Sequence, residues 1–279
     1  MTAAAHSPPL VRVAVIGVTG RMGQALLRAA PSFPQVIVTA AVASPRSLAL
    51  GRDAGAVAGL GPNNLIVTGD LAEALRQADV AIDFSRADAT QASLTACRAA
   101  RKPLLLGTTG LGAALEPAMT AAAREIALLA AANTSIAVAV LAELVRESAR
   151  SLPASFDIDV IETHHRTKQD APSGTALTLG RAAAGARGLP LPAAGAPAPS
   201  GVVGGRPEGQ VGMVSIRAGD VVGEHTVLFS GLGEQLALTH RAFDRGIFAR
   251  GALAAALWLV AQPPGRYGMR DFIGYKTSV

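Results

Sequence analysis

The sequence predicts an α/β protein whose N-terminal domain contains a parallel sheet and whose second, smaller domain is mixed α+β. Up to about residue 134, short apolar runs alternate with segments of helical pattern. This alternation is typical of parallel strands joined by right-handed helical crossovers. Beyond Asn133 the order changes to helix, strand, helix and then several strands, which indicates a separate unit.

In the first domain, apolar runs rich in leucine or β-branched residues are interpreted as strands and the segments between them as helices. Aromatic residues make up only 4% of the chain, so the core must consist mainly of Ala, Val, Leu and Ile. We expect strands at 11–17, 36–42, 65–69, 79–85, 102–106 and from 126, and helices at 21–30, 71–77, 87–100 and from 113.

The second domain is expected to contain a mixed sheet with helices. Residues 185–210 are dense in Gly, Pro and Ala and predict a long surface loop. The last helix of the chain is expected to return to the first domain. We expect helices at 137–151, 173–186 and 245–260, and strands at 156–165, 211–220, 224–231 and 236–238.

Charge and hydropathy exclude several classes of protein. The formal net charge is +5, but the basic residues form neither a long run nor a stripe with aromatics, so no nucleic-acid partner is expected. The excess of positive charge fits anionic small molecules. The apolar run at 251–261 is too short to span a bilayer, and the N-terminal segment lacks the pattern of a signal peptide. We therefore expect a cytoplasmic protein without a membrane partner.

Cys97 is the only cysteine, so no intrachain disulfide can form. This agrees with a reducing compartment. The residue lies in a run of helical pattern, where a buried structural thiol is expected rather than a reactive one.

Residues 17–23 (GVTGRMG) lie directly after the first strand and directly before the first helix. A phosphate needs backbone N–H donors at close range, and a helix N-terminus supplies them. Gly17 would permit the tight turn, Gly20 a close approach of the pyrophosphate, and Gly23 close packing of the helix on the strand. A structural turn without a ligand is the alternative. The pattern predicts a Rossmann-type dinucleotide site formed by Gly17, Val18, Thr19, Gly20, Arg21 and Met22.

The segment after the second strand bears on the choice of cofactor. An acidic residue normally binds the ribose of NAD at this place. Residues 40–47 (AAVASPRS) contain no Asp or Glu, and Ser44 and Arg46 stand where a 2′-phosphate could bind, with Arg21 nearby. We expect NADPH or NADH as cofactor, with a preference for NADPH. An Arg46 side chain that points to solvent is the alternative.

Two further loops follow strands of the expected parallel sheet. The carboxyl ends of such strands converge on the cofactor crevice, which the segment 83–85 should also line. The second of these loops, which begins at Ala131, is also expected to act as a hinge between the domains. The cofactor candidates in these loops are Gly107, Thr108, Thr109, Ala131, Ala132, Asn133 and Thr134.

The segment 162–177 (ETHHRTKQDAPSGTAL) places two histidines, an arginine and a lysine within 164–168, at the end of a strand. The next helix begins near Ser173, and its first N–H groups with the Thr175 hydroxyl could bind a carboxylate. Together these features predict a substrate with more than one carboxylate. Adjacent histidines of a strand point to opposite sides, so one could donate a proton while the other contacts an anion. No metal site is expected, because the pair lacks spaced Cys or carboxylate partners; a solvated basic loop is the alternative.

The string E-x-H-H-R-x-K-x-D-A-P-S-G-T-A-L resembles the signature of the 4-hydroxy-tetrahydrodipicolinate reductase family, also called the dihydrodipicolinate reductases. GVTGRMG, DFS, GTTG and the segment 217–259 match the family in the same order, so the resemblance covers essentially the whole chain. It implies reduction of a cyclic hydroxy-imine dicarboxylate, with loss of water, to tetrahydrodipicolinate in lysine and diaminopimelate biosynthesis. It also implies a homotetramer assembled through the sheet of the second domain.

Carried over residue by residue, the resemblance implies that His164 donates a proton and that Lys168 assists it. These roles are chemically compatible, because hydride addition leaves negative charge that a nearby acid must quench. Residues 1–134, with 244–279 returning, would form the dinucleotide-binding domain, and residues 135–243 the substrate-binding and oligomerisation domain. The substrate contacts expected from resemblance and helix cap together are His165, Lys168, Ser173, Gly174 and Thr175. The implied cofactor contacts fall on 17–22, 107–109 and 131–134.

The sequence departs from the family pattern at three places. The acidic residue that binds the ribose in the family is missing after the second strand, where this sequence has Ala43 and Ser44. Thr134 and Ala137 replace an aromatic residue and a glycine in the segment after the last strand of the first domain, and Thr167 stands where a histidine is common. These departures bear on cofactor preference and domain closure rather than on the reaction class.

Two other functions stay open at this point. Another two-domain dehydrogenase, acting on an amino-dicarboxylate or a homoserine-type substrate, would share the nucleotide site but would not require the cationic cluster at 164–168. A nucleotide-sensing regulator would bind the cofactor without turnover. Outside the candidate site, His225 is expected to be structural or an oligomer contact. His240 and Arg241 are expected at the surface, with Arg241 within reach of a substrate.

Overall fold

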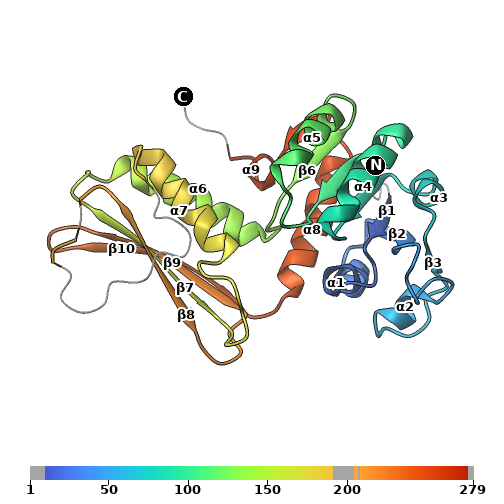
Figure 1. Cartoon of the computed structure of the whole chain (residues 1–279), viewed down its shortest axis with the longest axis horizontal. Coiled ribbons are helices and arrows are strands. Elements are labelled where there is room, and N and C mark those ends of the chain that lie inside the picture. The colour runs from blue at the N-terminus through green and yellow to red at the C-terminus, as the bar shows by residue number, and fades with distance from the viewer. Residues whose placement is uncertain (1–9, 191–203, 207, 276–279) are drawn as a thin grey trace, which may run out of the picture. The chain divides into compact units, whose positions relative to one another are not determined.

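The computed structural model describes residues 10–190, 204–206 and 208–275 and divides the chain into two compact units (Figure 1). One unit contains the residues up to Ser135 together with those from Gly246 onward, and the other runs from Ile136 to Arg245. The C-terminal segment therefore belongs to the same unit as the N-terminal strands, although the whole second unit separates them in the sequence.

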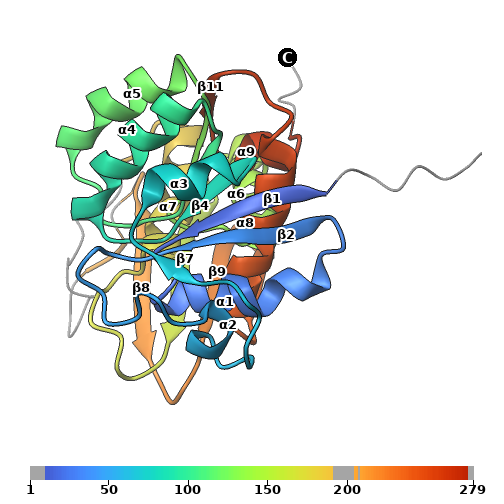
Figure 2. The same ribbon diagram turned by 90° about the vertical axis from the view of Figure 1, so that its right-hand side faces the viewer.

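The described part of the first unit contains a seven-stranded sheet in the order β3-β2-β1-β4-β5-β6-β11, and every neighbouring pair is parallel. Strands β1 and β2 lie side by side in Figure 2. The chain order reverses at β1, which pairs with β2 on one side and with β4 on the other. In open parallel sheets, ligands bind at the carboxyl ends of the strands beside such a reversal. The strands are β1 (Val11–Ile16), β2 (Val36–Val42), β3 (Val67–Thr68), β4 (Val80–Asp83), β5 (Leu104–Leu106), β6 (Ala127–Ala130) and β11 (Gly265–Tyr267).

Both faces of this sheet are covered, because β4 and β5 are buried at every residue. Helices α1 (Arg21–Ala29) and α8 (Gly246–Leu259) pack against each other, and α8 also packs on β4, β5 and β6. The return of the last helix thus completes the layer that α1 begins. The other α-helices described in this unit are α2 (Ala54–Val57), α3 (Leu71–Arg76), α4 (Thr90–Ala100), α5 (Glu116–Ala123) and α9 (Met269–Phe272).

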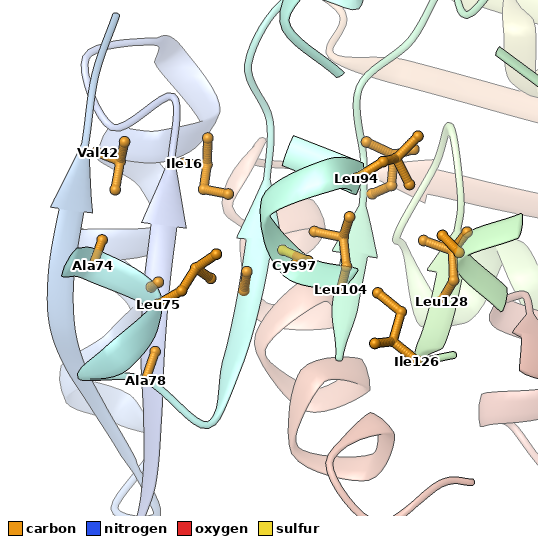
Figure 3. Close-up of a cluster of buried hydrophobic side chains, with 14 of the residues drawn as sticks. Ile16, Val42, Ala74, Leu75, Ala78, Leu94, Cys97, Leu104, Ile126 and Leu128 are labelled. Carbon is orange, nitrogen blue, oxygen red and sulfur yellow. The ribbon is translucent and has the colours of Figure 1, made fainter. Parts of the chain in front are cut away.

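A hydrophobic cluster lies between the sheet and helices α3, α4 and α5 (Figure 3). Ile16 and Leu104 enter it from the strands, and Leu75 and Leu94 from the helices. Cys97 of α4 lies in the same cluster and is completely buried. Burial raises the pKa of its thiol. The prediction that Cys97 is a structural thiol is therefore confirmed.

The described part of the second unit contains a four-stranded mixed sheet in the order β10-β9-β7-β8. Strands β7 and β8 are parallel, whereas β9 is antiparallel to both β7 and β10. Helices α6 and α7 pack against each other and against this sheet. The elements are α6 (Ile136–Ser151), β7 (Asp157–His164), α7 (Gly174–Arg187), β8 (Val211–Arg217), β9 (Gly223–Ser230) and β10 (Gln235–Ala242).

Strand β7 alternates between a buried face and a partly exposed one. Ile158, Val160, Glu162 and His164 are buried, and the residues between them are only partly buried or exposed. Ile158 and Val160 belong to the core under α6 and α7. Because side chains two residues apart in a strand point to the same face, Glu162 and His164 continue this row toward the end of the strand.

The predicted α/β fold class is confirmed, with differences in detail. The helix predicted at 87–100 begins with a 3₁₀ turn, and the strand expected at 65–69 is reduced to β3. Helix α7 extends to Arg187, so the first residues of the loop predicted at 185–210 are helical; most of that loop lies outside the described residues. Elements α2, β11 and α9 are too short to produce a sequence pattern. No helix in the described part of the chain is long and apolar enough to cross a membrane.

Candidate active site

The glycine-rich loop joins the end of β1 to the start of α1. Gly17 has a φ of +82°, and a Cβ there would lie 2.8 Å from the backbone of Ser85. The Gly20 N–H donates to the Gly17 carbonyl at 3.0 Å. A Cβ on Gly23 would overlap the Gly17 carbonyl oxygen. The close packing predicted for Gly23 is therefore present, and the positive φ of Gly17 fits the tight turn predicted there. The two glycines hold the loop against the segment after β4 and against α1.

The N-terminus of α1 fits a phosphate group. Its first N–H groups have no acceptor within the helix, and the N-cap residue Gly20 has no side chain to satisfy them. Gly20 and Arg21 are exposed, so an anion can approach these donors. Backbone donors at a helix N-terminus beside the reversal of strand order are the features that a dinucleotide pyrophosphate requires.

The loop after β5 contributes its residues unequally. Thr108 is 7% exposed, and its hydroxyl lies 3.5 Å from the backbone oxygen of Asp83, so this side chain is turned toward the sheet. Thr109 is exposed. A Cβ on Gly107 would overlap the ring of Phe84, so this glycine keeps the two neighbouring loops in close contact. Of the three predicted cofactor contacts in this loop, Thr109 can offer its side chain to a ligand, whereas Gly107 and Thr108 can offer only backbone atoms.

In the loop after β6, too, some of the predicted cofactor contacts are turned inward and others are exposed. The Thr134 hydroxyl donates to the Phe248 carbonyl in α8 at 2.7 Å, and Thr134 is 1% exposed. This contact ties the end of β6 to α8 within the first unit. Asn133 accepts the Ser135 N–H at 2.8 Å, and Ala132 is exposed. The structure thus gives Thr134, which replaces an aromatic residue of the family pattern, a structural role.

The loop after β2 offers cations and no carboxylate. Ser44 and Arg46 are exposed, and the Ser44 hydroxyl accepts the backbone N–H of Arg46 at 3.3 Å. Asp53, the first acidic residue after β2, accepts the N–H groups of Ala56, Asn63 and Asn64. The hydrogen bond from Ala56 in particular lowers the pKa of Asp53. Asp53 is therefore held by its own loop and does not replace the missing ribose-binding acid.

In the second unit, Glu162 and His164 form a buried pair at the end of β7. Glu162 is 1% exposed and its carboxylate contacts His164 Nδ1. Arg217 of β8 donates to both carboxylate oxygens, at 3.0 and 2.8 Å. The parallel register of β7 and β8 pairs His164 with Arg217, which explains how the guanidinium reaches the carboxylate. The Ser173 N–H is a further donor to Glu162, at 3.3 Å.

His225 of β9 packs against this pair from the other side of β7. Its ring centroid lies 5.0 Å from that of His164, with the planes at 75°. The Ser173 hydroxyl lies 3.1 Å from His225 Nε2 and also caps α7 by accepting the Ala176 N–H. His225 is therefore structural, as one expectation held, whereas the expectation of an oligomer contact is wrong, because its ring lies inside the subunit. The Ser173 hydroxyl is likewise used within the protein.

Lys168 and His165 lie in the loop that leads from β7 to α7. Lys168 Nζ donates to Asp170 at 2.8 Å and keeps the pKa of this carboxyl below its usual value. Because Asp170 is exposed, the Lys168 ammonium that it binds lies near the protein surface. His165 Nδ1 lies 2.7 Å from the Thr167 hydroxyl. The two adjacent histidines thus have different partners, as expected from their positions in the chain.

Burial and neighbouring charges set the protonation of the histidines. Burial lowers the pKa of His164, whereas Glu162 raises it by hydrogen bonding and by its charge; the pKa stays below the usual value. Burial lowers the pKa of His225 to about 4 and also lowers that of His240. Burial opposes ionisation of Glu162, but hydrogen bonds from Arg217, Ser215 and His164 outweigh it, so the pKa of Glu162 is lowered.

Sequence reasoning missed Glu162, Arg217, His225 and Asp170 as parts of this cluster. The spacing E-x-H within a strand could have indicated Glu162, since it places both side chains on one face. Arg217 and His225 come from other strands, and no local pattern indicates their proximity. Arg241, which was expected to be within reach of a substrate, is exposed and pairs with Glu224 at 3.0 Å.

Comparisons with known proteins match both halves of the chain. The family model described as dihydrodipicolinate reductase, N-terminus, matches residues 11–134, and the model of its C-terminus matches residues 137–273. The 4-hydroxy-tetrahydrodipicolinate reductase of Halorhodospira halophila is 46% identical over 262 residues, which cover 94% of this chain and 98% of that protein. The enzyme of the same name from Anaeromyxobacter dehalogenans is 44% identical over 267 residues, which cover 96% and 99%.

Solved structures show the same fold. A dipicolinate-bound dihydrodipicolinate reductase from Paenisporosarcina sp. TG-14 matches with a TM-score of 0.74 at 22% identity and covers 94% of this chain and 99% of that one. An amine dehydrogenase from Mycobacterium smegmatis matches with a TM-score of 0.63 at 15% identity, over 95% and 96%. A fold shared by such enzymes does not select a reaction. The family models and the relatives above 40% identity do, and the chain belongs to the dihydrodipicolinate reductase family.

Proposed function

We propose that the chain reduces 4-hydroxy-tetrahydrodipicolinate to tetrahydrodipicolinate with loss of the hydroxyl group as water, with His164 as the proton donor and Lys168 as a substrate-binding cation. Family membership makes it an NAD(P)H-dependent oxidoreductase of lysine and diaminopimelate biosynthesis. The observation that carries the residue roles is the buried His164, held by Glu162 and flanked by Lys168 in front of the α7 N-terminus. A cytoplasmic location is part of the proposal.

The substrate carboxylates bind at the N-terminus of α7 and to the cations before it. The helix has 14 residues and begins at Gly174, and the N-terminus of a helix attracts anions. Ser173 supports this site by capping α7 rather than by offering its hydroxyl to the substrate. Lys168 and His165 supply the charge that a dicarboxylate requires.

His164 supplies the proton that the reaction consumes. When bound, the nicotinamide cofactor supplies a hydride. The negative charge left on the substrate is quenched by the imidazolium of His164, and Lys168 stabilises the charge as it develops. Burial lowers the pKa of His164, so the bound dicarboxylate has to raise it again before the acid is formed. In this way the acid forms mainly when the substrate is present.

NADPH binds at least as well as NADH in this proposal. The cofactor contacts are the α1 N-terminus, Thr109 and the loop after β6. The exposed Ser44 and Arg46, with Arg21 in the first turn of α1, receive the 2′-phosphate. The loop residues near them include no carboxylate that could repel this phosphate, because Asp53 is held elsewhere.

The proposed homotetramer forms through the sheet of the second unit. The face of β8 that points away from α6 and α7 carries Val214 and Ile216, which are 39% and 44% exposed. Thr226 and Thr239 continue this face on β9 and β10, where their hydroxyls lie 2.9 Å apart. A sheet face with exposed apolar side chains is a suitable surface for a second copy of the chain.

One coupled assay tests the reaction. The preceding synthase, supplied with pyruvate and aspartate semialdehyde, generates the unstable substrate, and oxidation of NADH or NADPH is followed by absorbance. Turnover that requires both the synthase and the chain supports the proposal. Absence of oxidation of either cofactor, with a related reductase active in the same mixture, contradicts it.

A further inference from the structure

The carboxylate of Glu162 is completely buried and has several partners. His164 contacts one of its oxygens, Arg217 donates to both, and the Ser173 N–H donates to Oε1. Burying a carboxylate is costly unless its oxygens are satisfied by such partners. The partners come from β7, β8 and the start of α7. Folding of the second unit therefore assembles this group of contacts around His164.

The two nitrogens of His164 have different surroundings. Nδ1 faces the acceptor Glu162, so it carries a proton whenever Glu162 is ionised. Nε2 lies above the start of β9, where a Cβ at Gly223 would be 3.1 Å away. Gly223 has no side chain that would cover Nε2. The side chain of His164 keeps an exposed fraction of 11%.

We propose that Glu162 is a positioning residue that fixes His164 with its proton on Nδ1, so that Nε2 is the nitrogen that delivers the catalytic proton, while Arg217 holds Glu162 in place. The inference rests on the role of His164 proposed above. After delivery, the imidazole is neutral and keeps one proton on Nδ1, donated to Glu162. No further proton has to move between His164 and Glu162. Glu162 only orients the imidazole, as a carboxylate beside a catalytic histidine does.

Other charged groups surround His164 and set the sign of the pH effects. Lys168 and Arg217 lower the pKa of His164, and Glu162 raises it. His225 is held neutral by burial, and His164 and His240 act on it in the same direction. Arg217 also donates to the Asp170 carbonyl at 2.6 Å, and Asp170 binds Lys168. Arg217 thus holds the positions of both residues proposed to act on the substrate.

The substitution Glu162→Gln tests the inference with little change in volume. Oε1 accepts from both Arg217 and the Ser173 N–H, so the amide oxygen keeps this position. The NH₂ of the new amide then takes the place of Oε2, faces Nδ1 and requires it to be an acceptor. We expect the tautomer of His164 to change from Nδ1–H to Nε2–H in ¹H–¹⁵N correlation spectra of ¹⁵N-histidine-labelled protein, assigned with His164→Gln. We expect kcat to fall by about 10-fold or more, up to the roughly 10,000-fold loss that follows when the carboxylate orienting a catalytic histidine is replaced by its amide. The pH profile of kcat/KM should shift to lower pH.

Asp159→Asn is the matched control. Asp159 lies on the same strand and binds Arg206 at 2.8 Å, but on the other face of the sheet. The substitution Asp159→Asn should leave the tautomer of His164 and the pH profile of kcat/KM unchanged. An Nε2–H tautomer in the wild-type protein would overturn the inference. So would a Glu162→Gln protein that keeps the wild-type tautomer and pH profile.

If Glu162→Gln does not fold, Glu162→Asp keeps the charge for Arg217 and withdraws the oxygens from His164. A mixture of tautomers then supports the inference, and a pure Nδ1–H tautomer overturns it. The spectra need neither substrate nor cofactor. A chain with the expected tautomers but without reductase activity would therefore contradict the proposed function and not the positioning of His164.

Discussion

The glycine-rich loop of the first unit and the charged cluster of the second unit are built by different means. In the loop, the backbone itself forms the site: Gly17 and Gly23 bring β1, β4 and α1 into contact, and no side chain caps the helix. In the cluster, side chains form the site: Glu162 is held by His164 and Arg217. The loop should therefore tolerate changes of charge but not added volume, and the cluster should tolerate small changes of volume but not of charge.

The largest effect should come from the cluster. His164→Ala should lower kcat by about 100- to 10,000-fold, the usual contribution of a positioned acid. Cofactor binding, measured by fluorescence titration, should stay unchanged, because the predicted cofactor contacts come from the first unit. Turnover within a few-fold of the wild-type value would show that His164 is not the acid and that the cluster only binds substrate.

A second test uses the buried His225. Its folded-state pKa of about 4 is lower than that of an unfolded histidine, so the unfolded state binds more protons between about pH 6.5 and pH 4. The free energy of unfolding should therefore fall as the pH is lowered through this range, by about 3 kcal/mol from this residue. His225→Gln should remove most of this dependence in urea unfolding at several pH values. If the free energy of unfolding depended equally on pH in the wild type and in His225→Gln, the low pKa of His225 would be contradicted.

Lys168→Ala tests whether the cluster binds a carboxylate. A charge-assisted hydrogen bond contributes about 1.5–3 kcal/mol, so kcat/KM should fall by about 10- to 100-fold. KM should rise and kcat should fall, because the ammonium binds both ground state and transition state. Pyridine-2,6-dicarboxylate should compete with substrate in the wild type and more weakly in the variant. Arg166→Ala, an exposed neighbour, is the control; a decrease in kcat with unchanged KM would argue against carboxylate binding by Lys168.

Gly23→Ala tests the volume limit of the loop. A Cβ there overlaps the Gly17 carbonyl, so the substitution should destabilise the protein by about 1–3 kcal/mol and weaken cofactor binding. Gly185→Ala is the control, because this helical glycine has nothing within 4 Å of its Cβ. It should raise stability by about 0.4–1 kcal/mol. Similar effects of the two substitutions in thermal unfolding would mean that helix propensity, and not packing, explains Gly23.

The smallest effect is expected from a charge added to the loop after β2. Ser44 is exposed, so Ser44→Asp adds a carboxylate without disturbing the core. It should shift the ratio of affinities for NADPH and NADH by about tenfold toward NADH, because it repels the 2′-phosphate and accepts from the 2′-hydroxyl. Arg46→Ala should weaken NADPH binding only. A wild-type preference for NADH of tenfold or more, titrated at fixed ionic strength, would contradict the proposed phosphate site.

Much of the first unit could be predicted from the sequence because its signals are local. Apolar runs such as Leu104–Leu106 mark the strands of a sheet buried on both faces, and the glycines at 17, 20 and 23 mark the turn into α1. The cationic segment before Ser173 and the helix that it opens are likewise contiguous. The sequence by itself therefore determined the alternation of elements. It also indicated the candidate cofactor loop and, through the family resemblance, the candidate acid His164.

The tertiary structure decided which side chains support that acid. Arg217 and His225 lie on β8 and β9, and they reach Glu162 and His164 only because these strands pair with β7 in one register. Strand β11 shows the same limit, since its three residues become a strand only by pairing with β6. The structure also turned the Ser173 and Thr134 hydroxyls inward. Such contacts join residues far apart in the chain, and short-range patterns of hydropathy and charge carry no information on which strands become neighbours.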